Sequence, residues 1–387
     1  MTRTQMFLVF FSIVLAIYGL LNTYIFIRGL QLFPHGSPIR IWYIAVFWFL
    51  ALSYIIARLL ERITLSWFSD GMVWIGSYWL GAMVYFFLAI LVIDVVRLVN
   101  YVVPFFPSFI TQNIHAAKQW TGIIISGIVL VCVIGMRFNA MYPRIRTLDL
   151  SINKQSPLKT LNVALASDIH LGTIICHGHF KRIVEKINSL HPDIVLFAGD
   201  VVDEDIQPVI RENLGELLRE IKSKYGVYAI TGNHEYIGGV DPACKYLTEH
   251  GIVELRDSTA TIDSAFVLVG REDISSRQFY GKRRKSLDEL LAGIDRSLPI
   301  IMMDHQPMHL EDAADHGIDL QLSGHTHHGQ LWPFNYITRA VYELSWGYLK
   351  KGNTQYYVSC GVGGWGPPMR SGNTPEIVNL KIQFTGK

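Results

Sequence analysis

The hydrophobic pattern divides the chain into an apolar first part and a second part of ordinary soluble character. Met6–Ile27 is a nearly uninterrupted apolar run, and a helix needs about 20 such residues to cross a bilayer. The run is long for a signal peptide and has no clear small-residue cleavage site after it, which favours a retained helix. Three further runs, over Ile41–Leu60, Gly71–Val96 and Trp120–Met136, predict a transmembrane domain of about four helices over residues 1–140. The aromatic stretch Tyr101–Ile114 is broken by prolines, which is typical of an interfacial or re-entrant segment.

Basic residues at the ends of these runs predict how the chain is oriented. With an even number of helices, the N-terminus and the C-terminal part lie on the same side of the membrane. That side has the larger number of basic residues, which favours a multi-pass protein of the cell membrane with a cytoplasmic C-terminal domain. The first side carries Arg3, Arg58, Arg62, Arg137, Arg144 and Arg146, and the other carries Arg28, Arg40, Arg97 and Lys118.

Two charged residues near the end of the third run, Asp94 and Arg97, lie three positions apart on one helical face. They are either a functional pair inside the membrane or, as we prefer, a mark of the helix end at the interface. The net charge of the whole chain is only +2, and no basic tract is long enough to predict nucleic acid as a partner.

The pattern changes after a polar segment, residues 141–160, which we expect to be a linker. Short apolar runs then alternate with stretches of helical periodicity up to residue 387, which predicts one α/β layered domain over residues 161–387. The expected strands are Leu161–Ala166, Ile194–Ala198, Val227–Thr231, Phe266–Val269, Ile300–Met303, Leu320–Leu322, Tyr356–Ser359 and Ile377–Ile382, and the expected helices are Phe180–Leu190, Pro208–Lys224 and Pro242–Glu249.

Side chains that can bind metal follow five of the expected strands, one strand after another. Because sites in α/β folds gather at the carboxyl ends of strands, these side chains are expected to converge. A single Asp or His beside a strand is more often a structural residue, so the joint occurrence is what carries weight. The set is Asp168 and His170, then Asp200 and Asp203, then Asn233, His234 and Glu235, then His305, and finally His325, His327 and His328.

The mixture of carboxylate, amide and imidazole groups indicates which metals fit. Without thiolates, such a set suits Mn²⁺, Fe or Zn²⁺ in a catalytic site better than a structural zinc cluster. The four cysteines lie far apart and form no CxxC pair, so they predict neither a zinc cluster nor a disulfide framework.

Several short motifs, taken together and in order, resemble the calcineurin-like metallophosphoesterases. They are Asp168-Ile169-His170, Gly199–Asp203, Gly232–Glu235, His305 and Gly324–His327. The stretch Gly361–Pro368 is also similar to the YkuE-like branch, which includes membrane-associated phosphoesterases. The resemblance implies a four-layer αββα sandwich and does not extend to the membrane helices.

Position by position, the resemblance implies two divalent metal ions, with Mn²⁺ favoured. One ion would take Asp168, His170, Asp200 and His327, and the other Asp200, Asn233, His305 and His325. Asp200 would then bridge the two ions, and a hydroxide shared by the ions would be the nucleophile.

Other residues are expected to act around these ligands. His234 would face the substrate as general acid or hydrogen-bond donor, with Asp203 orienting its ring and Glu235 behind the ligands. The alternative for all three is a turn network that holds Asn233. Arg271 and Arg370 are weak candidates for binding the substrate phosphate. Glu204 stands where serine/threonine protein phosphatases of this superfamily have an arginine, which argues against a phosphoprotein substrate.

The leading interpretation is a membrane-anchored hydrolase of a phosphate ester or pyrophosphate bond. Four helices are more than a tether requires, so a lipid-linked substrate is suggested, like that of the related UDP-diacylglucosamine hydrolases. One alternative is a nucleotide or general phosphodiesterase for which the membrane part is only a tether. Another, from a different class, is a non-catalytic membrane scaffold or sensor, which would be expected to have lost metal ligands.

Overall fold

The computed structural model describes residues 3–386, and for residues 3–8, 10 and 62 it describes only the backbone. The side chains of Arg3 and Arg62, which entered the charge comparison, therefore lie outside the described residues. The chain forms two compact units, of which the first is helical and the second contains all the described strands.

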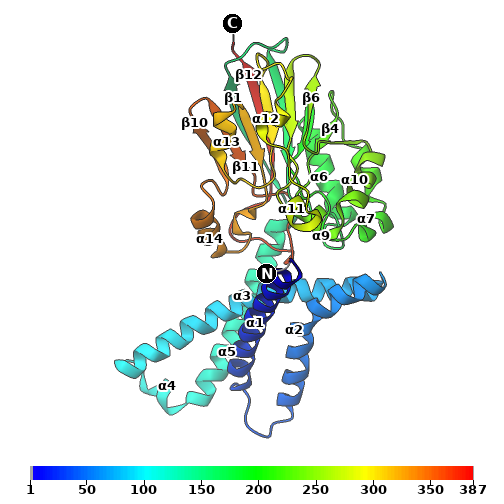
Figure 1. The fold of residues 1–387 in the computed structure, drawn as a ribbon. Helices are drawn as coiled ribbons and strands as arrows, with labels where there is room; N and C mark the ends of the chain where they lie inside the picture. The colour runs from blue at the N-terminus through cyan, green and yellow to red at the C-terminus, as the bar shows by residue number, and fades with distance from the viewer. Residues whose placement is uncertain (1–2, 387) are drawn as a thin grey trace. The chain divides into compact units, whose positions relative to one another are not determined.

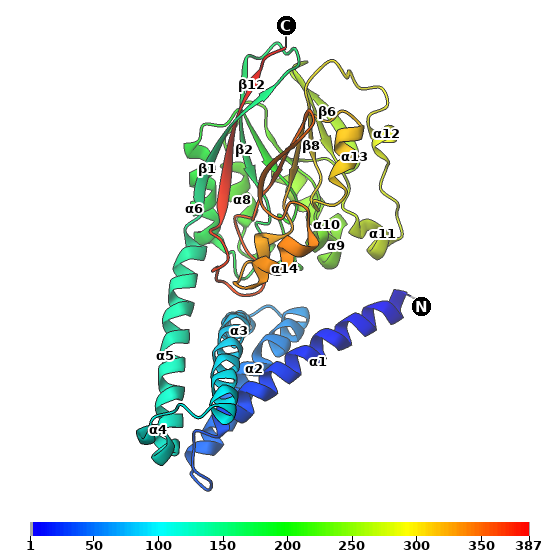
Figure 2. The same ribbon diagram turned by 90° about the vertical axis from the view of Figure 1, so that its left-hand side faces the viewer.

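The helical unit confirms the four predicted apolar helices. In the described chain, four helices are long and apolar enough to cross a membrane. Most of the residues in these apolar segments are not buried inside the protein, as expected for helices whose side chains face lipid. The proline-broken stretch contains only the short helix α4 (Figures 1 and 2). The five helices are α1 (Arg3–Leu30), α2 (Ile39–Ile63), α3 (Trp67–Val102), α4 (Ser108–Gln112) and α5 (Ile114–Met141).

The second unit is built around two six-stranded mixed sheets. The first sheet has the strand order β1-β12-β2-β3-β4-β5, and the second has the order β10-β11-β9-β8-β7-β6. The strands of the first sheet are β1 (Arg144–Ile152), β12 (Glu376–Phe384), β2 (Thr160–Ala166), β3 (Ile194–Phe197), β4 (Val227–Ala229) and β5 (Ile252–Glu254). Those of the second are β10 (Gly347–Lys351), β11 (Thr354–Val358), β9 (Leu320–Ser323), β8 (Ile300–Met303), β7 (Phe266–Gly270) and β6 (Ser258–Ile262).

Helices cover the outer faces of both sheets and complete the predicted αββα layers. Between the two sheets lies an apolar core that includes Leu165, Leu196 and Leu322. A second core fills the space between the first sheet and its helices, and a third lies under α12 and α13. The helices are α6 (His177–Ser189), α7 (Gln207–Arg211), α8 (Leu214–Arg219), α9 (Asn233–Gly238), α10 (Val240–Glu249), α11 (Ser275–Tyr280), α12 (Leu287–Leu290), α13 (Leu310–Asp315) and α14 (Phe334–Val341), with a 3-10 turn at His327–Gly329.

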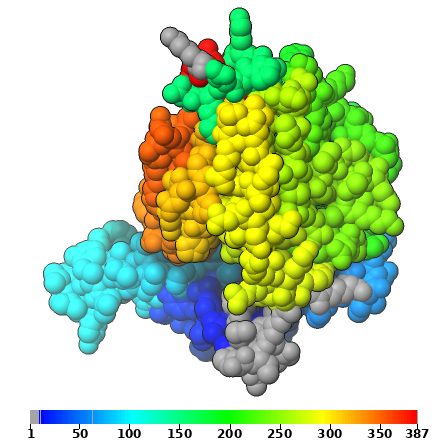
Figure 3. Space-filling view, turned by 45° about the horizontal axis from the view of Figure 1, so that its top comes forward, coloured from blue at the N-terminus to red at the C-terminus, as the bar shows by residue number. Residues whose placement is uncertain are grey.

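The segment around α12 (yellow) lies on the surface of the second unit (Figure 3). Leu287 and Leu290 of α12 pack there against Val267 and Met302.

Two expected elements differ from the structure. Within the expected linker, residues 144–152 form β1, which pairs in parallel with β12 over its whole length. The helix expected over Pro208–Lys224 is divided into α7 and α8, because Asn213 between them has a left-handed backbone (φ 51°).

Candidate metal centre

The predicted ligands follow strand ends in both sheets. Asp168 and His170 follow β2, and Asp200 follows β3, its parallel neighbour. His305 and His325 follow β8 and β9, which are also parallel neighbours. The sequence order of strand and polar loop therefore brings side chains from both sheets to one edge of the sandwich.

The backbone at these positions is unusual. Asp168, His170, Asp200, His325 and His327 all have positive φ, between 45° and 71°. A residue with a side chain in this region carries a steric cost of about 1–2 kcal/mol. Such strain is concentrated at functional sites, where the surrounding structure enforces it.

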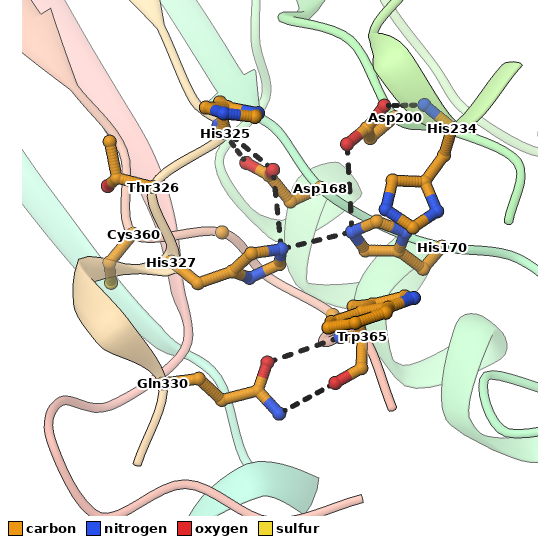
Figure 4. Close-up of polar contacts among 12 residues, drawn as sticks. Asp168, His170, Asp200, His234, His325, Thr326, His327, Gln330, Cys360 and Trp365 are labelled. Carbon is orange, nitrogen blue, oxygen red and sulfur yellow. Dashed lines mark hydrogen bonds and ion pairs between the residues drawn. The ribbon is translucent and has the colours of Figure 1, made fainter. Parts of the chain in front are cut away.

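One group of ligand atoms is formed by Asp168, His170 and His327. The Nε2 atoms of His170 and His327 lie 3.1 Å apart, and His327 Nε2 is 3.5 Å from Asp168 Oδ1 (Figure 4). Asp168 also accepts hydrogen bonds from the backbone N–H of His325, at 2.9 and 3.1 Å. The carboxylate is thereby oriented toward both histidines.

A second group is formed by Asp200, His305 and His325. His305 Nε2 lies 3.1 Å from Asp200 Oδ2, and the same carboxylate oxygen is 3.9 Å from His170 Nε2 in the first group. Asn233 joins here, since its Oδ1 is 2.8 Å from His325 Nδ1. Asp200 thus lies between the two groups.

The donor set fits divalent cations. His305 Nδ1 lies 2.7 Å from Ala198 O, so the ring is fixed and its buried Nε2 faces Asp200 Oδ2 at 3.1 Å. The Nε2 atoms of His170 and His327, 3.1 Å apart, either share one N–H or both offer lone pairs to a cation between them. Cations that accept imidazole nitrogen and carboxylate oxygen fit both groups of side chains.

Charges within the centre strongly shift the pKa values of its side chains. Burial favours the neutral form of Asp200, but the imidazoles of His305, His234 and His170 outweigh burial and hold its pKa well below the ordinary value. Burial and the neighbouring charge of His305 lower the pKa of His325 to about 3. His325 is therefore neutral, which is the form in which imidazole binds metal.

His234 is held from two directions. Its backbone N–H donates to Asp200 Oδ1 at 2.9 Å, and its Nδ1 lies 3.0 Å from Asp203 Oδ1. Burial by itself would lower the pKa of His234, but Asp200 and Asp203 raise it to about 9. Glu235 accepts hydrogen bonds from the backbone N–H groups of Val202 and Gly232, so it braces the loops that carry Asp200 and Asn233.

The two arginines considered for substrate binding are both buried. Arg271 is 5% exposed and pairs with Asp304 at 3.0 Å, outside the two ligand groups. Arg370 is 1% exposed; it donates to the carbonyl oxygens of Cys360 and Gly363, and its Nη2 lies 3.1 Å from His327 Nδ1. Arg370 is therefore adjacent to the centre and contacts a candidate ligand.

Trp365 is a residue of the site that the sequence analysis did not assign. Its ring centroid lies 5.8 Å from that of His234 (Figure 4). Its indole N–H donates to Glu204 Oε1 at 3.3 Å. The Gln330 side chain bonds to both the backbone N–H and the carbonyl of Trp365. Trp365 belongs to the Gly361–Pro368 stretch, so the family resemblance of that stretch is the sequence feature that could have identified it.

Comparison with known proteins agrees with this architecture. The profile of the family "Calcineurin-like phosphoesterase" matches residues 161–329. An uncharacterized metallophosphoesterase of Aquifex aeolicus is 31% identical over 60% of this chain and 88% of its own length. A Danio rerio "Transmembrane protein with metallophosphoesterase domain" is 31% identical over 66% of this chain and 60% of its own. YkuE of Bacillus subtilis, an uncharacterized metallophosphoesterase, is 28% identical over 57% of this chain and 78% of its own length.

Coverage differs among these relatives. The chain spans 64% of the length of the uncharacterized Helicobacter pylori metallophosphoesterases that it matches. The matched family segment begins within β2 and ends at the 3-10 turn that carries His327, so it includes every candidate ligand. This chain, whose described part includes four helices long and apolar enough to cross a membrane, belongs to the calcineurin-like metallophosphoesterase family.

Proposed function

We propose that this protein is a two-metal hydrolase of a phosphate ester or pyrophosphate bond. The observation that carries the proposal is the position of Asp200, whose Oδ2 is 3.1 Å from His305 and 3.9 Å from His170, each in a different ligand group. Asp168, His170, Asp200 and His327 would hold one ion, and Asp200, Asn233, His305 and His325 the other. Two divalent ions held by these residues would activate water and offset the charge of the phosphate.

His234 supplies the protein's own acid–base group in this proposal. Its ring centroid lies 4.5 Å from that of His170 in the first ligand group, and the contact with Asp203 fixes which nitrogen faces away from Asp203. With Nδ1 held by Asp203, Nε2 is free to donate a proton or hydrogen bond to the leaving oxygen. Asp203 is a positioning residue, and Glu235 and Arg370 orient the loops and ligands behind it.

We further propose that the substrate is linked to a lipid. Around α14, in the unit that carries the metal centre, five large apolar side chains are exposed, by 39% to 63%: Trp332, Phe334, Tyr336, Ile337 and Val341. Tyr342, directly after α14, stacks edge-on with the candidate ligand His325 at 6.1 Å. An apolar surface that leads to a phosphate-cleaving centre suits a substrate with a lipid tail.

The catalytic proposal is tested with the full chain in detergent, first stripped of metal and then loaded with Mn²⁺, Zn²⁺ or Fe²⁺. Turnover of bis-p-nitrophenyl phosphate, p-nitrophenyl phosphate and a UDP-linked lipid should require added metal, with Mn²⁺ the most effective. His234→Asn should keep its metal and lose about 10²–10⁴-fold in kcat, the usual contribution of a general acid. His309→Asn is the matched control, because His309 is an exposed histidine outside the centre. A loaded wild-type protein that turns over none of these compounds would support the non-catalytic scaffold instead.

The substrate proposal is tested by a pair of exposed isoleucines. Ile337→Ser removes apolar surface beside α14, whereas Ile210→Ser changes a comparably exposed isoleucine on α7. Ile337→Ser should lower kcat/KM for the lipid-linked compound about tenfold, the effect expected for one isoleucine that becomes buried when the lipid binds, and leave turnover of bis-p-nitrophenyl phosphate unaffected. Equal effects of both variants, or equal effects on both compounds, would favour a general phosphodiesterase on a membrane tether.

We also propose that the metal centre faces the cytoplasm. Cys244 and Cys360 are buried and unsuitable as reporters, but Lys245 has a side chain that is 76% exposed. Lys245→Cys should resist an impermeant thiol reagent in intact cells and react after permeabilisation. Labelling in intact cells would place the centre outside.

A further inference from the structure

The helical unit contains a cavity of about 570 Å³ whose wall includes residues from α1, α2, α3 and α5. Ligand sites in proteins have volumes of about 300–1,000 Å³, so the cavity is large enough for a substantial part of a small molecule. Most of its wall is apolar and aromatic, as illustrated by Ile25, Phe47, Trp79, Ile90 and Ile125. An occupant of this region must therefore be apolar itself.

The charged residues of the cavity wall lie at one end. Arg28 is near the end of α1, Asp94 and Arg97 are near the end of α3, and Lys118 is near the start of α5. Because the long helices alternate in direction, these positions meet at the same end of the helical unit, where α4 also lies (Figure 2). The cavity thus has an apolar body and a charged mouth.

The mouth has an excess of positive charge. Asp94 is the one carboxylate among the described residues that line the cavity, against Arg28, Arg97 and Lys118. It pairs with Arg28 at 2.6 Å and with Arg97 at 3.3 Å, and it also accepts a hydrogen bond from Tyr24. One carboxylate cannot neutralise three cations, so the mouth presents a site for an anion.

Partial exposure of these side chains keeps the mouth accessible. The side chain of Arg97 is 46% exposed and that of Arg28 is 32% exposed, although both are in contact with Asp94. Arginine and lysine side chains form strong charge-assisted hydrogen bonds with phosphate, so such a mouth attracts the headgroup of an anionic lipid. Ionisable residues within membrane helices are energetically costly, so their presence is itself an indication of function.

We propose that this cavity binds one anionic phospholipid. An acyl chain occupies the apolar body, and the headgroup phosphate lies between Arg97 and Lys118, with Arg28 behind. A free phosphate would make no use of the apolar body, and an uncharged lipid would leave the excess charge of the mouth unmatched. The site is separate from the metal centre, and the inference does not depend on the proposed hydrolysis.

The test is native mass spectrometry of the full chain in detergent, titrated with phosphatidylglycerol or with phosphatidylcholine of the same acyl chains. One phosphatidylglycerol should bind more tightly than the first phosphatidylcholine. Arg97→Gln and Lys118→Gln should each weaken phosphatidylglycerol about fivefold, the effect of removing one cation near a headgroup. Arg40→Gln is the matched control, since Arg40 lies near the start of α2 and does not line the cavity.

A second pair of variants tests the apolar body. Ala117 lines the cavity, whereas its neighbour Ala116 is exposed and does not. Ala117→Phe should abolish the tight one-lipid complex, and Ala116→Phe should retain it. Thermal unfolding of each variant identifies one that has simply failed to fold.

Three results would overturn the inference. The first is equal affinity for the two lipids, and the second is an equal loss of phosphatidylglycerol affinity in the lining and control variants. The third is that inorganic phosphate raises the thermal unfolding temperature as much as phosphatidylglycerol does. The first two indicate a non-specific lipid annulus, and the third indicates a site for a free anion.

Discussion

Gly199, between β3 and Asp200, offers a sharp test of how the metal centre is assembled. Its φ is +89°, and a Cβ added there would lie 2.4 Å from His305 Nδ1. Ordinary carbon contacts begin near 3.5 Å, so either the ring or the loop must move by roughly 1 Å. His305 cannot move away easily, because it is fully buried and its Nδ1 lies 2.7 Å from Ala198 O.

Gly199→Ala should therefore affect stability and chemistry together. The left-handed backbone adds about 1–2 kcal/mol for alanine, and the displaced loop carries Asp200 directly. Misplacement of a catalytic group by about 1 Å can lower the rate about 100-fold. We expect a loss of that size in kcat/KM, with less metal retained after dialysis.

Gly226→Ala is the matched control. Gly226 has a φ of +93°, but a Cβ there would meet only Tyr228 Cε2, at 3.8 Å. This variant should show only the backbone cost, seen as a Tm lower by about 2–4 °C for each kcal/mol. Its metal content and kcat/KM should not change. Thermal unfolding, elemental analysis for metal and turnover of bis-p-nitrophenyl phosphate check both variants. If the two alanine variants have the same metal content and the same activity, the argument that Gly199 is needed for His305 is wrong.

Three further predictions concern the same unit. Asp200→Asn should reduce both metals together in elemental analysis, whereas Asp203→Asn should keep both; loss of one metal only in Asp200→Asn would contradict bridging. Burial and the charge of Glu235 raise the pKa of Glu254 to about 8, so the folded state binds this proton more tightly than the unfolded state and loses stability as pH rises from about 4.5 to 8. Glu254→Gln should therefore have a flatter Tm–pH profile and a Tm above wild type near pH 9, and an unchanged profile would refute this. Leu196→Ala in the core between the sheets should lower the free energy of unfolding by about 2–5 kcal/mol, against about 0.5 or less for the half-exposed Val253→Ala.

The positions of the candidate ligands could be predicted because each follows a strand of strongly apolar sequence. Strands such as β3, with every residue buried, have an unambiguous pattern, and the polar residues after them can lie only at the sheet edge. The apolar membrane helices were predictable for a similar reason, since their length alone distinguishes them. The family resemblance then supplied the proposed pairing of ligands with metals, which strand positions alone do not give.

Other features were less readable. β1 is exposed at Arg144–Thr147, and only its second half, where Leu148, Leu150 and Ile152 alternate with polar residues and reach the core, has a strand pattern, too short to distinguish it from a linker. The left-handed backbone at Asp168 and Asp200 could not be predicted either, because aspartate tolerates this conformation without requiring it and tertiary contacts impose it here. The burial of Arg370 was likewise hidden, because an arginine is rarely expected to be buried without knowledge of its acceptors.

The position of β12 has a consequence for synthesis of the protein. β12 lies between β1 and β2, in parallel with the first and antiparallel to the second, yet it follows every other strand in the chain. While the ribosome is still making the preceding segments, β1 has no partner and one edge of β2 is open. Unpaired strand edges of this kind promote association between chains. During translation, the first sheet therefore stays divided until Glu376–Phe384 emerges, which makes the interval before that point the time when a chaperone is most needed.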